Sequence, residues 1–269
     1  MNEDNQVNKN KEPLLISIII PMLNEENTIK NVINNIPNHL KNELIIIDDG
    51  SQDDSVKMVK EIKRDIKLIL NGKNLGYTAS ILKGLRAATG DICVTMDADG
   101  QHDPKEIQTV INPIIDGEAD MVVGSRYLGE CIYFVPLYTR IAEYLIGLCL
   151  RFLFRQRVYN NQSGFRAFNR KSLFFIDEII TSKFGFCTEV LFKAAYNKIR
   201  IKEVPITIGK RQFGVSYVNI LEIFWPITLT ILLFTLKKFK NILRKLIPKK
   251  LLERIYLIIT KSIKNMDRI

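Results

Sequence analysis

Residues 15–21, Leu15-Ile-Ser-Ile-Ile-Ile-Pro21, form an apolar run of strand length near the start of the chain. A second run, Leu44–Ile47, leads directly into the polar sequence Asp48-Asp49-Gly50-Ser51. Short apolar runs rich in β-branched residues are typical of strands that helices cover on both faces of a parallel sheet. The two runs therefore predict two buried parallel strands.

Helical and strand-like segments alternate after these runs. The pattern predicts helices at 27–35, 53–64 and 78–88, and strands at 66–70 and 92–96. This alternation is typical of an α/β fold, in which helices flank the sheet. Such sheets bind ligands beyond the carboxyl ends of their strands, where three polar clusters fall. The clusters are Asn24-Glu25-Glu26, Asp48-Asp49 and Asp97-Ala98-Asp99, and we expect them to converge at one edge as a nucleotide site.

The strand predicted at 92–96 ends in two carboxylates, Asp97 and Asp99, and Gln101 follows them. Side chains alternate along an extended backbone, so these three side chains point the same way. Oxygen ligands of this kind suit Mg²⁺ or Mn²⁺, which completes its shell with water and substrate phosphates. A solvated turn would also explain an isolated Asp-x-Asp. The two other polar clusters at the same edge favour a metal and nucleotide diphosphate site.

The second half of the chain combines an apolar helix with scattered arginines. A strand at 120–124 precedes Ser125 and Arg126, a long apolar helix is predicted at 140–154, and another strand at 201–208. The helix suits a lipid acceptor, although ordinary core packing would also explain its apolar residues. Because a guanidinium fork matches phosphate oxygens, four arginines are candidate phosphate ligands, and each alone is also compatible with a surface charge. They are Arg126, Arg140, Arg166 and Arg211.

Charge is distributed unevenly. Residues 1–13 are polar and asparagine-rich, which predicts a disordered arm without a signal peptide and a protein on the cytosolic side. Residues 237–269 hold eleven Lys and Arg against two Asp and Glu, whereas residues 1–236 hold 28 against 27. Nearly all of the net charge of +10 therefore lies in the tail. This placement favours an anionic membrane over nucleic acid as the partner. Four widely spaced cysteines argue against a zinc site or a disulfide framework.

Two apolar segments accompany this basic tail. The run 223–236 would span ~21 Å as a helix, short of the ~30 Å hydrocarbon core, so we expect it to lie at the membrane interface. Further on, apolar residues recur at helical spacing among lysines and arginines, which predicts a basic amphipathic helix. A helix packed on the protein body, or a homodimer contact, is the alternative. The apolar residues are Leu251, Leu252, Ile255, Ile258, Ile259 and Ile263.

The order of motifs resembles glycosyltransferase family 2, the inverting sugar transferases of GT-A fold, and within it the dolichyl or polyprenyl phosphate glycosyltransferases. The resemblance covers about residues 15–216. It implies a Rossmann-like, mixed and mostly parallel sheet flanked by helices, with the catalytic domain at 14–216 and basic amphipathic, membrane-associating helices at 217–269. Eight motifs in order carry it: 20–26 (IPMLNEE), 47–51 (IDDGS), 74–76 (NLG), 88–91 (ATGD), 97–104 (DADGQHDP), 124–126 (GSR), 163–166 (SGFR) and 203–206 (EVPI).

The resemblance implies roles for individual residues. The nucleotide sugar would be bound by Pro21, Leu23, Glu25, Ile47, Asp49, Asp97, Ala98 and Asp99. The metal would be held by Asp97, Asp99 and Gln101, and the acceptor phosphate by Arg126, Arg140 and Ser163. Asp99, Arg126 and Arg211 would act in catalysis, with the arginines facing the phosphates.

The resemblance implies a metal-dependent, inverting transfer of a hexose-type sugar from a UDP- or GDP-sugar to a polyprenyl phosphate at the cytosolic membrane face. Transfer to a sugar hydroxyl in glycolipid or polysaccharide synthesis is the alternative, and a sugar nucleotidyltransferase is a second. A hydroxyl acceptor requires a base, for which Glu189 is the candidate. A helix-start acid capped by Thr188 is the other interpretation of Glu189. Self-association of the chain is left open.

Two departures from the family pattern concern the acceptor site. Asn160 and Asn161 stand where an acid is usual. Relatives often place a lysine after the Gly-x-Ser that follows the Arg211 position, where this chain has Tyr217. We hypothesise that Lys210 supplies the missing charge.

Overall fold

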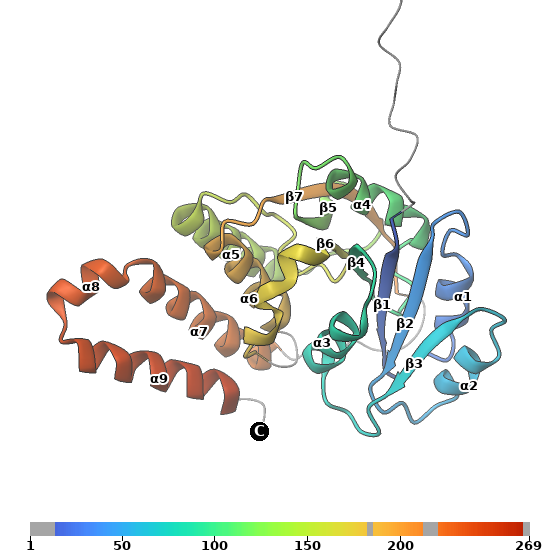
Figure 1. Ribbon diagram of the computed structural model, residues 1–269, viewed down its shortest axis with the longest axis horizontal. Helices are drawn as coiled ribbons and strands as arrows, with labels where there is room; N and C mark the ends of the chain where they lie inside the picture. Colours follow the sequence, from blue (N-terminus) through green and yellow to red (C-terminus); the bar gives the residue numbers. More distant parts are fainter. Residues whose placement is uncertain (1–13, 182–184, 212–219, 266–269) are drawn as a thin grey trace, which may run out of the picture.

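The computed structural model describes residues 14–181, 185–211 and 220–265 (Figure 1). Within them, seven strands form one sheet in the order β3-β2-β1-β4-β6-β5-β7. The strands are β1 (Ile16–Met22), β2 (Asn42–Asp48), β3 (Ile66–Leu70), β4 (Ile92–Thr95), β5 (Met121–Cys131), β6 (Arg166–Asn169) and β7 (Ile201–Ile208). Only β6 runs antiparallel to its neighbours β4 and β5 in this sheet. The predicted mixed, mostly parallel sheet is confirmed.

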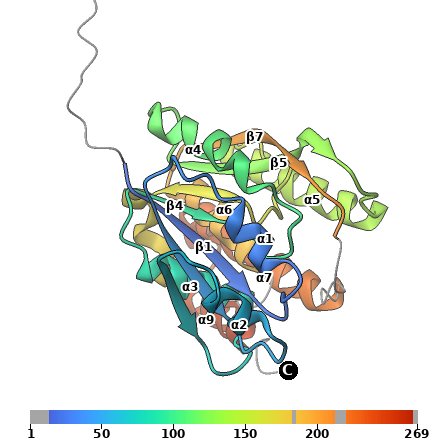
Figure 2. The same ribbon diagram turned by 90° about the vertical axis from the view of Figure 1, so that its right-hand side faces the viewer.

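Helices cover both faces of the sheet. The α-helices are α1 (Ile29–Asn34), α2 (Ser55–Lys60), α3 (Tyr77–Ala87), α4 (Ile107–Ile115), α5 (Leu137–Phe154), α6 (Phe186–Tyr196), α7 (Ile220–Lys238), α8 (Lys240–Leu246) and α9 (Lys249–Asn265), and the 3₁₀ segments are η1 (Pro104–Glu106) and η2 (Arg170–Glu178). Strand residues alternate between the two faces. Ile18 and Ile46 pack towards α1 and α4, whereas Ile19 and Ile45 share a second core with α3, α5 and α6. Figure 2 shows the sheet between these two layers.

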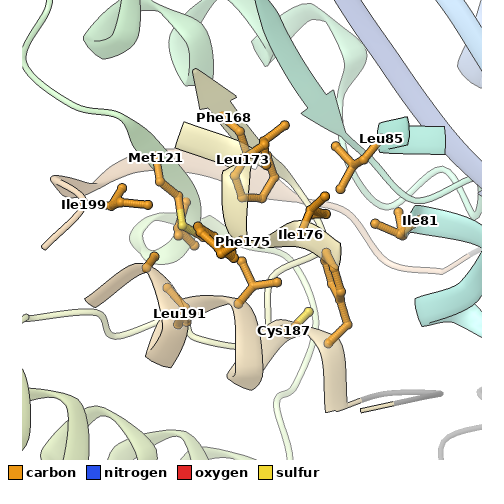
Figure 3. Packing of buried hydrophobic residues seen from close by; sticks show 14 of the residues in the cluster. Ile81, Leu85, Met121, Phe168, Leu173, Phe175, Ile176, Cys187, Leu191 and Ile199 are labelled. Carbon is orange, nitrogen blue, oxygen red and sulfur yellow. The ribbon is translucent and has the colours of Figure 1, made fainter. Parts of the chain in front are cut away.

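The second core joins the two halves of the chain. Figure 3 shows Met121 and Phe168 from the sheet, Phe175 and Ile176 from η2, and Leu191 from α6 packed together. Ile81 and Leu85 of α3 join the same cluster, so the N-terminal strands and the later helices share one interior. This packing fixes the carboxyl ends of β1 and β4 relative to α5 and α6.

The order in which the chain adds strands to the sheet changes direction at β1. From β1 it proceeds outward through β2 to β3, then returns to place β4 on the other side of β1. Such a reversal opens a crevice at the carboxyl ends of the two strands, and ligands of α/β sheets bind there. The three predicted polar clusters follow β1, β2 and β4, so their convergence at this edge is confirmed.

Strands β5 and β6 differ from the sequence expectation. The four-residue β6 was not predicted because Arg166 was interpreted as part of a phosphate-binding motif. Strand β5 continues to Cys131, beyond the predicted end at 124, because its pairing with β7 resumes at Glu130 and Cys131 after an irregularity between Ser125 and Glu130. Such a bulge re-aims side chains out of the ladder. Arg126 lies in it.

The C-terminal helices form a hairpin that extends away from the sheet (Figure 1). Phe234 of α7 packs on Phe192 and Tyr196 of α6, and Leu233 packs on α9. Three of the six residues of the predicted amphipathic stripe, Leu252, Ile259 and Ile263, are buried. Ile259 and Ile263 pack with Leu233, and Ile255 is partly buried in the same cluster. Leu251 and Ile258 are exposed. The stripe therefore serves partly as packing on the body, which was the alternative, and partly as an open apolar surface.

No helix in the described ranges is both long and apolar enough to cross a bilayer. The predicted arm at 1–13 and the predicted boundary at 216/217 lie outside the described residues, as does Tyr217.

Candidate active site

The loops that follow β1 and β2 are tied together by hydrogen bonds. The Asn24 backbone N–H donates to Ser51 Oγ at 3.0 Å, and the Gln52 N–H donates to Asn24 Oδ1 at 2.8 Å. Asn24 adopts φ of 55°, a left-handed conformation that asparagine tolerates better than most residues. The Glu25 N–H donates to Ser55 Oγ at 2.7 Å. These contacts hold Glu25 at the rim of the crevice.

Arg211, which follows β7, links Glu25 to Asp99. Arg211 Nη2 lies 2.9 Å from Glu25 Oε1, and Arg211 Nε lies 3.8 Å from Asp99 Oδ2. Burial raises the pKa of Glu25, Thr28 and Arg211 lower it, and nearby Asp99 raises it again. Glu25, Asp97, Asp99 and Arg211 are referred to below as the donor cluster.

Asp97 is held from two sides at the end of β4. Tyr77 Oη at the start of α3 donates to Asp97 Oδ1 at 3.1 Å, and His102 Nδ1 lies 3.7 Å from Asp97 Oδ2. A Cβ atom at Gly164 would come within 2.5 Å of Asp97 Oδ2. Glycine at 164 is therefore required by the close approach of this carboxylate.

The carboxylates of Asp97 and Asp99 carry like charges, and their repulsion is unfavourable. Burial raises the pKa of Asp97; Asp99 raises it further, while His102 and Tyr77 lower it. A divalent cation between the carboxylates would relieve this repulsion, and hard oxygen ligands are what Mg²⁺ and Mn²⁺ prefer. Both carboxylates retain access to solvent, with side-chain exposures of 32% for Asp97 and 14% for Asp99. The residues present thus fit a hard cation.

Gln101 ties the loop after β4 to Gly209, the residue that follows β7. Its N–H donates to Asp99 Oδ1 at 3.0 Å, and its Nε2 donates to the Gly209 carbonyl at 3.0 Å. The Gly209 N–H returns a bond to the Gln101 carbonyl at 2.8 Å. With the amide nitrogen used in this way, the side-chain oxygen is the atom left to bind a metal. Among the described residues, no group of three His, Cys, Asp or Glu side chains could hold a metal ion, so a ligand set here would include the amide.

Of the residues predicted to bind a nucleotide, Pro21 and Leu23 are half-buried beside this crevice. Asp49 is buried, and its carboxylate accepts bonds from the Leu75 and Gly76 N–H groups at 2.9 and 2.8 Å. It therefore fixes the loop before α3. Ile47 was expected to line the crevice, but its side chain is fully buried in the core. Strand β2 points it at α3.

A second group of residues surrounds Arg126 on β5. Arg126 Nη2 donates to both carboxylate oxygens of Glu143 on α5, at 2.7 and 2.8 Å. Arg126 Nη1 donates to Tyr133 Oη at 3.2 Å, and the guanidinium lies 5.2 Å from the ring centre of Tyr127. Tyr127 Oη also donates to Glu143. Burial raises the pKa of Tyr133, Arg126 lowers it, and Cys131, Glu143 and Asp99 raise it further.

A cavity of about 490 Å³ opens against α5, next to this ion pair. Its lining is mostly apolar and aromatic, with Glu143 and Tyr127 on one wall and three arginines, Arg140, Arg151 and Arg157. It is called the α5 cavity below. The outer face of α5 continues it with exposed apolar residues: Leu137, Tyr138, Ile141, Tyr144, Leu145, Leu148 and Phe152. Such a patch on a monomer typically marks an interaction surface.

Two residues predicted as ligands have other roles here. Arg166 is 1% exposed and donates to the backbone carbonyls of Ser163, Cys187 and Asn161, so it braces loops and faces no ligand. Ser163 is buried, and its Oγ accepts from the Phe165 N–H; it does not line the α5 cavity. The structure does not bring either residue to the arginines of α5.

Glu189 is also placed away from the donor cluster. Its side chain is 1% exposed, and its carboxylate accepts from the Ile180 and Thr181 N–H groups and from Thr181 Oγ1. Lys193 Nζ lies 3.7 Å away. With its oxygens occupied in this way, Glu189 has no geometry for a general base. Glu189 lies in the first turn of α6, as the alternative expected, but the N-cap is Gly185 and not Thr188, whose Oγ1 accepts from Gln162 Nε2.

The two asparagines that stand in place of an acid are fully buried. Asn160 Nδ2 donates to the Gly124 carbonyl, and Asn161 Nδ2 donates to the Glu143 carbonyl. The buried acid of this region is therefore Glu143. Lys210 is exposed at the end of β7.

Sequence reasoning missed Tyr77, His102 and Glu143. His102 occurs in the quoted acidic motif, and its spacing from Asp97 would have suggested a contact. Tyr77 and Glu143 lie in helices whose apolar periodicity gave no indication of a polar role, and only the packing of α3 and α5 brings them to the site.

Comparison with known proteins shows the family. A family model described as Glycosyl transferase family 2 matches residues 17–175. The chain is 35% identical over 222 residues to UDP-N-acetylglucosamine–dolichyl-phosphate N-acetylglucosaminyltransferase of Methanococcus voltae, covering 75% of this chain and 88% of the relative. It is 32% identical over 210 residues to dolichol-phosphate mannosyltransferase of Pyrococcus furiosus, covering 75% of this chain and 58% of the relative.

A solved structure shares the fold. Glucosyl-3-phosphoglycerate synthase from Mycobacterium tuberculosis, in complex with Mn²⁺, UDP-glucose and phosphoglyceric acid, superposes with a TM-score of 0.62 at 21% identity. The match covers 84% of this chain and 79% of that one.

Proposed function

Because this chain belongs to glycosyl transferase family 2 and has the GT-A fold, we propose that it transfers a hexose-type sugar from a nucleotide sugar to a polyprenyl phosphate. Transfer would invert the anomeric centre and depend on a divalent metal. The observation that carries the proposal is the pairing of Arg211 with Glu25 at the carboxyl ends of the strands, 3.8 Å from Asp99, which gathers charges suited to a diphosphate and its metal. The apolar α5 cavity, lined by Glu143 of the Arg126–Glu143 pair, supports a lipid phosphate acceptor.

The donor cluster suits a sugar nucleotide's diphosphate. Asp97, Asp99 and the Gln101 side-chain oxygen would hold Mg²⁺ or Mn²⁺, and the metal would stabilise negative charge on the leaving phosphate. Arg211, held by Glu25, would add a second positive charge there. The crevice above β1 and β2, near Pro21, Leu23 and Asp49, would take the base and ribose.

The α5 cavity suits a phosphate attached to an apolar chain. Arg140 would bind the phosphate with Arg126, and the aromatic wall would receive the first isoprene units. A phosphate acceptor is already ionised near neutral pH, so the reaction requires no general base. The position of Glu189, with its carboxylate occupied, is consistent with that.

The named relatives support both substrate classes. The Methanococcus voltae and Pyrococcus furiosus proteins carry dolichyl-phosphate or dolichol-phosphate in their names. UDP-N-acetylglucosamine is therefore the first donor to test, followed by GDP-mannose.

The outer surface of α5 and the open side of the C-terminal hairpin suit a membrane. Exposed apolar residues of both lie beside basic ones, such as Arg254 near Leu251 and Leu257 of α9. Apolar side chains entering the interface with lysines and arginines at the headgroups would bring the α5 cavity to its lipid. We propose the cytosolic face as the site of action.

The test is a transfer assay with detergent-solubilised protein, a panel of UDP- and GDP-sugars, and polyprenyl phosphate, with Mn²⁺, Mg²⁺ or EDTA. A sugar-phosphate lipid formed only with metal is the expected product. Transfer only to a sugar hydroxyl would establish the glycolipid or polysaccharide alternative. Release of pyrophosphate from a nucleoside triphosphate would establish a nucleotidyltransferase.

A further inference from the structure

We propose that Glu143, which lines the α5 cavity, is a positioning residue for Arg126. The inference rests on the proposed function, because it takes Arg126 as a group that meets the transferring phosphates. It assigns a role to a carboxylate that no motif of the sequence identified.

The geometry of the pair is that of a fixed contact. Both partners are buried, with side-chain exposures of 10% for Arg126 and 2% for Glu143, and one nitrogen, Nη2, serves both carboxylate oxygens. A buried charge pair that loses one partner leaves the other uncompensated, which is strongly unfavourable. Arg126 therefore stays where Glu143 holds it.

Two tyrosines complete the support. Tyr127 Oη donates to Glu143, and its ring lies beside the Arg126 guanidinium. Tyr133 Oη accepts from Arg126 Nη1. Both tyrosines come from β5 and the segment after it, whereas Glu143 comes from α5. The guanidinium is thus fixed by two separate elements of the fold.

These contacts leave part of Arg126 available. A guanidinium has five N–H donors. Within the described residues, Nη2 is used by Glu143 and one Nη1 hydrogen by Tyr133, while the buried Nε has no hydrogen-bond partner. An unsatisfied buried donor is costly unless a ligand completes it. A phosphate oxygen is such a ligand.

The position of Glu143 connects the pair to the acceptor. Glu143 lines the α5 cavity, and Arg140, one turn earlier on α5, lines it as well. The Glu143 carbonyl accepts from Asn161 Nδ2 at 2.7 Å, which fixes this turn of the helix against the core. The same stretch of α5 therefore carries Arg140 and the carboxylate that pairs with Arg126. A phosphate bound by Arg140 would then meet the remaining donors of Arg126.

A double-mutant cycle tests the coupling between Glu143 and Arg126. The variants are Glu143→Gln, which keeps the side-chain shape but removes the charge, Arg126→Gln, and the two combined. Each single change is expected to lower kcat/KM for the lipid acceptor by about 10- to 100-fold, since a small displacement of a positioning group has effects of that size. If Glu143 acts through Arg126, the double variant matches Arg126→Gln within about twofold.

Further readouts separate positioning from a structural role. The Kd of Glu143→Gln for the free nucleotide diphosphate is expected to stay close to wild type, whereas its thermal unfolding midpoint is expected to fall because buried Arg126 loses its partner. Glu143→Asp is expected to recover part of kcat. Tyr127→Phe, which leaves the ion pair intact, is expected to lower kcat less than Glu143→Gln. Exposed Glu130→Gln on the same strand is the matched control and is expected to change nothing.

Additive losses in the double variant would overturn the inference, as would wild-type kinetics of Glu143→Gln. The outcome is separable from that of the proposed function. If the wild-type protein uses a sugar hydroxyl and no phosphate acceptor, the proposed acceptor is wrong, and the same cycle measured with the hydroxyl acceptor still decides whether Glu143 acts through Arg126. If the wild-type protein transfers to neither, both fail.

Discussion

Arg211 and Glu25 form an ion pair at 2.9 Å although 186 positions separate them in the chain. The contact joins the loop after the first strand to the end of the last strand, directly over Asp99. It brings segments that are distant in the chain together in the donor cluster. A charge that holds Arg211 in place before substrate arrives also removes reorganisation from the reaction.

Asp99→Asn is predicted to lower sugar transfer by about 100-fold or more, because a ligand of the metal and of the donor diphosphate loses its charge. The measurement is the initial rate at saturating Mn²⁺. Exposed Asp116→Asn, at the end of α4, is the control and should retain wild-type activity. A retained rate in Asp99→Asn would remove this residue from the site.

Tyr77→Phe is predicted to weaken the activation constant for Mn²⁺ by about tenfold, because the hydroxyl that orients Asp97 is lost. The rate at saturating metal should fall less. Tyr138→Phe, at an exposed position on α5, is the comparison. Unchanged metal dependence would mean that Tyr77 does not orient the ligand.

Arg140→Gln is predicted to raise the KM for polyprenyl phosphate about tenfold without altering nucleotide affinity, since it loses a charge-assisted contact to the acceptor alone. Arg155→Gln is the matched control, because Arg155 follows the same helix and does not line the α5 cavity. Equal effects of the two variants would show that Arg140 contributes only general positive charge.

Glu203 provides a pH prediction outside the donor cluster. Burial raises its pKa above the ordinary 4.5, against the lowering effect of the Tyr159 and Asn160 N–H groups. The folded state then binds more protons than the unfolded state above pH 4.5, so this residue's contribution to stability falls as pH rises through its folded pKa.

The measurement compares urea unfolding of wild type and Glu203→Gln from pH 4.5 to about 7. The variant should lack this decline, so the wild type should lose stability relative to it as pH rises. Glu118→Gln at an exposed ion pair is the control. A stability difference independent of pH would show that the folded pKa of Glu203 is not raised.

Lys250→Gln combined with Arg254→Gln is predicted to reduce binding to vesicles containing anionic lipid by about 30-fold, at roughly 1 kcal/mol for each charge. Lys60→Gln with Lys63→Gln removes the same charge from exposed positions at the opposite end of the sheet. Equal losses in cosedimentation would indicate an unspecific charge effect and argue against the hairpin as the membrane contact.

The sheet and the donor edge were predictable because their signals are local. Apolar runs such as 15–21 specify buried strands, and carboxylates that follow such strands must lie at one edge of a parallel sheet. The short β6 was not predictable in this way, since a four-residue antiparallel strand depends on its neighbours. The amphipathic pattern of α9 was recognised, but the pattern does not distinguish lipid from a helical partner. Part of the apolar face of α9 packs on α7.

Individual side chains were less predictable, because a residue type does not reveal what surrounds it. Arg166 and Glu189 carry charges suited to a site, yet backbone groups of adjacent loops satisfy both. Glu143 gave no signal within an apolar helix, and its role follows from Arg126, which the bulge in β5 turns towards α5.

The most direct test of the central claim is transfer of radiolabelled sugar from UDP-N-acetylglucosamine or GDP-mannose to polyprenyl phosphate, measured by extraction into organic solvent with and without EDTA. The account predicts a labelled lipid product that EDTA abolishes, that Mn²⁺ or Mg²⁺ restores, and that Asp99→Asn fails to form. A labelled lipid formed equally well in EDTA, or label transferred only to sugar hydroxyls, would contradict it.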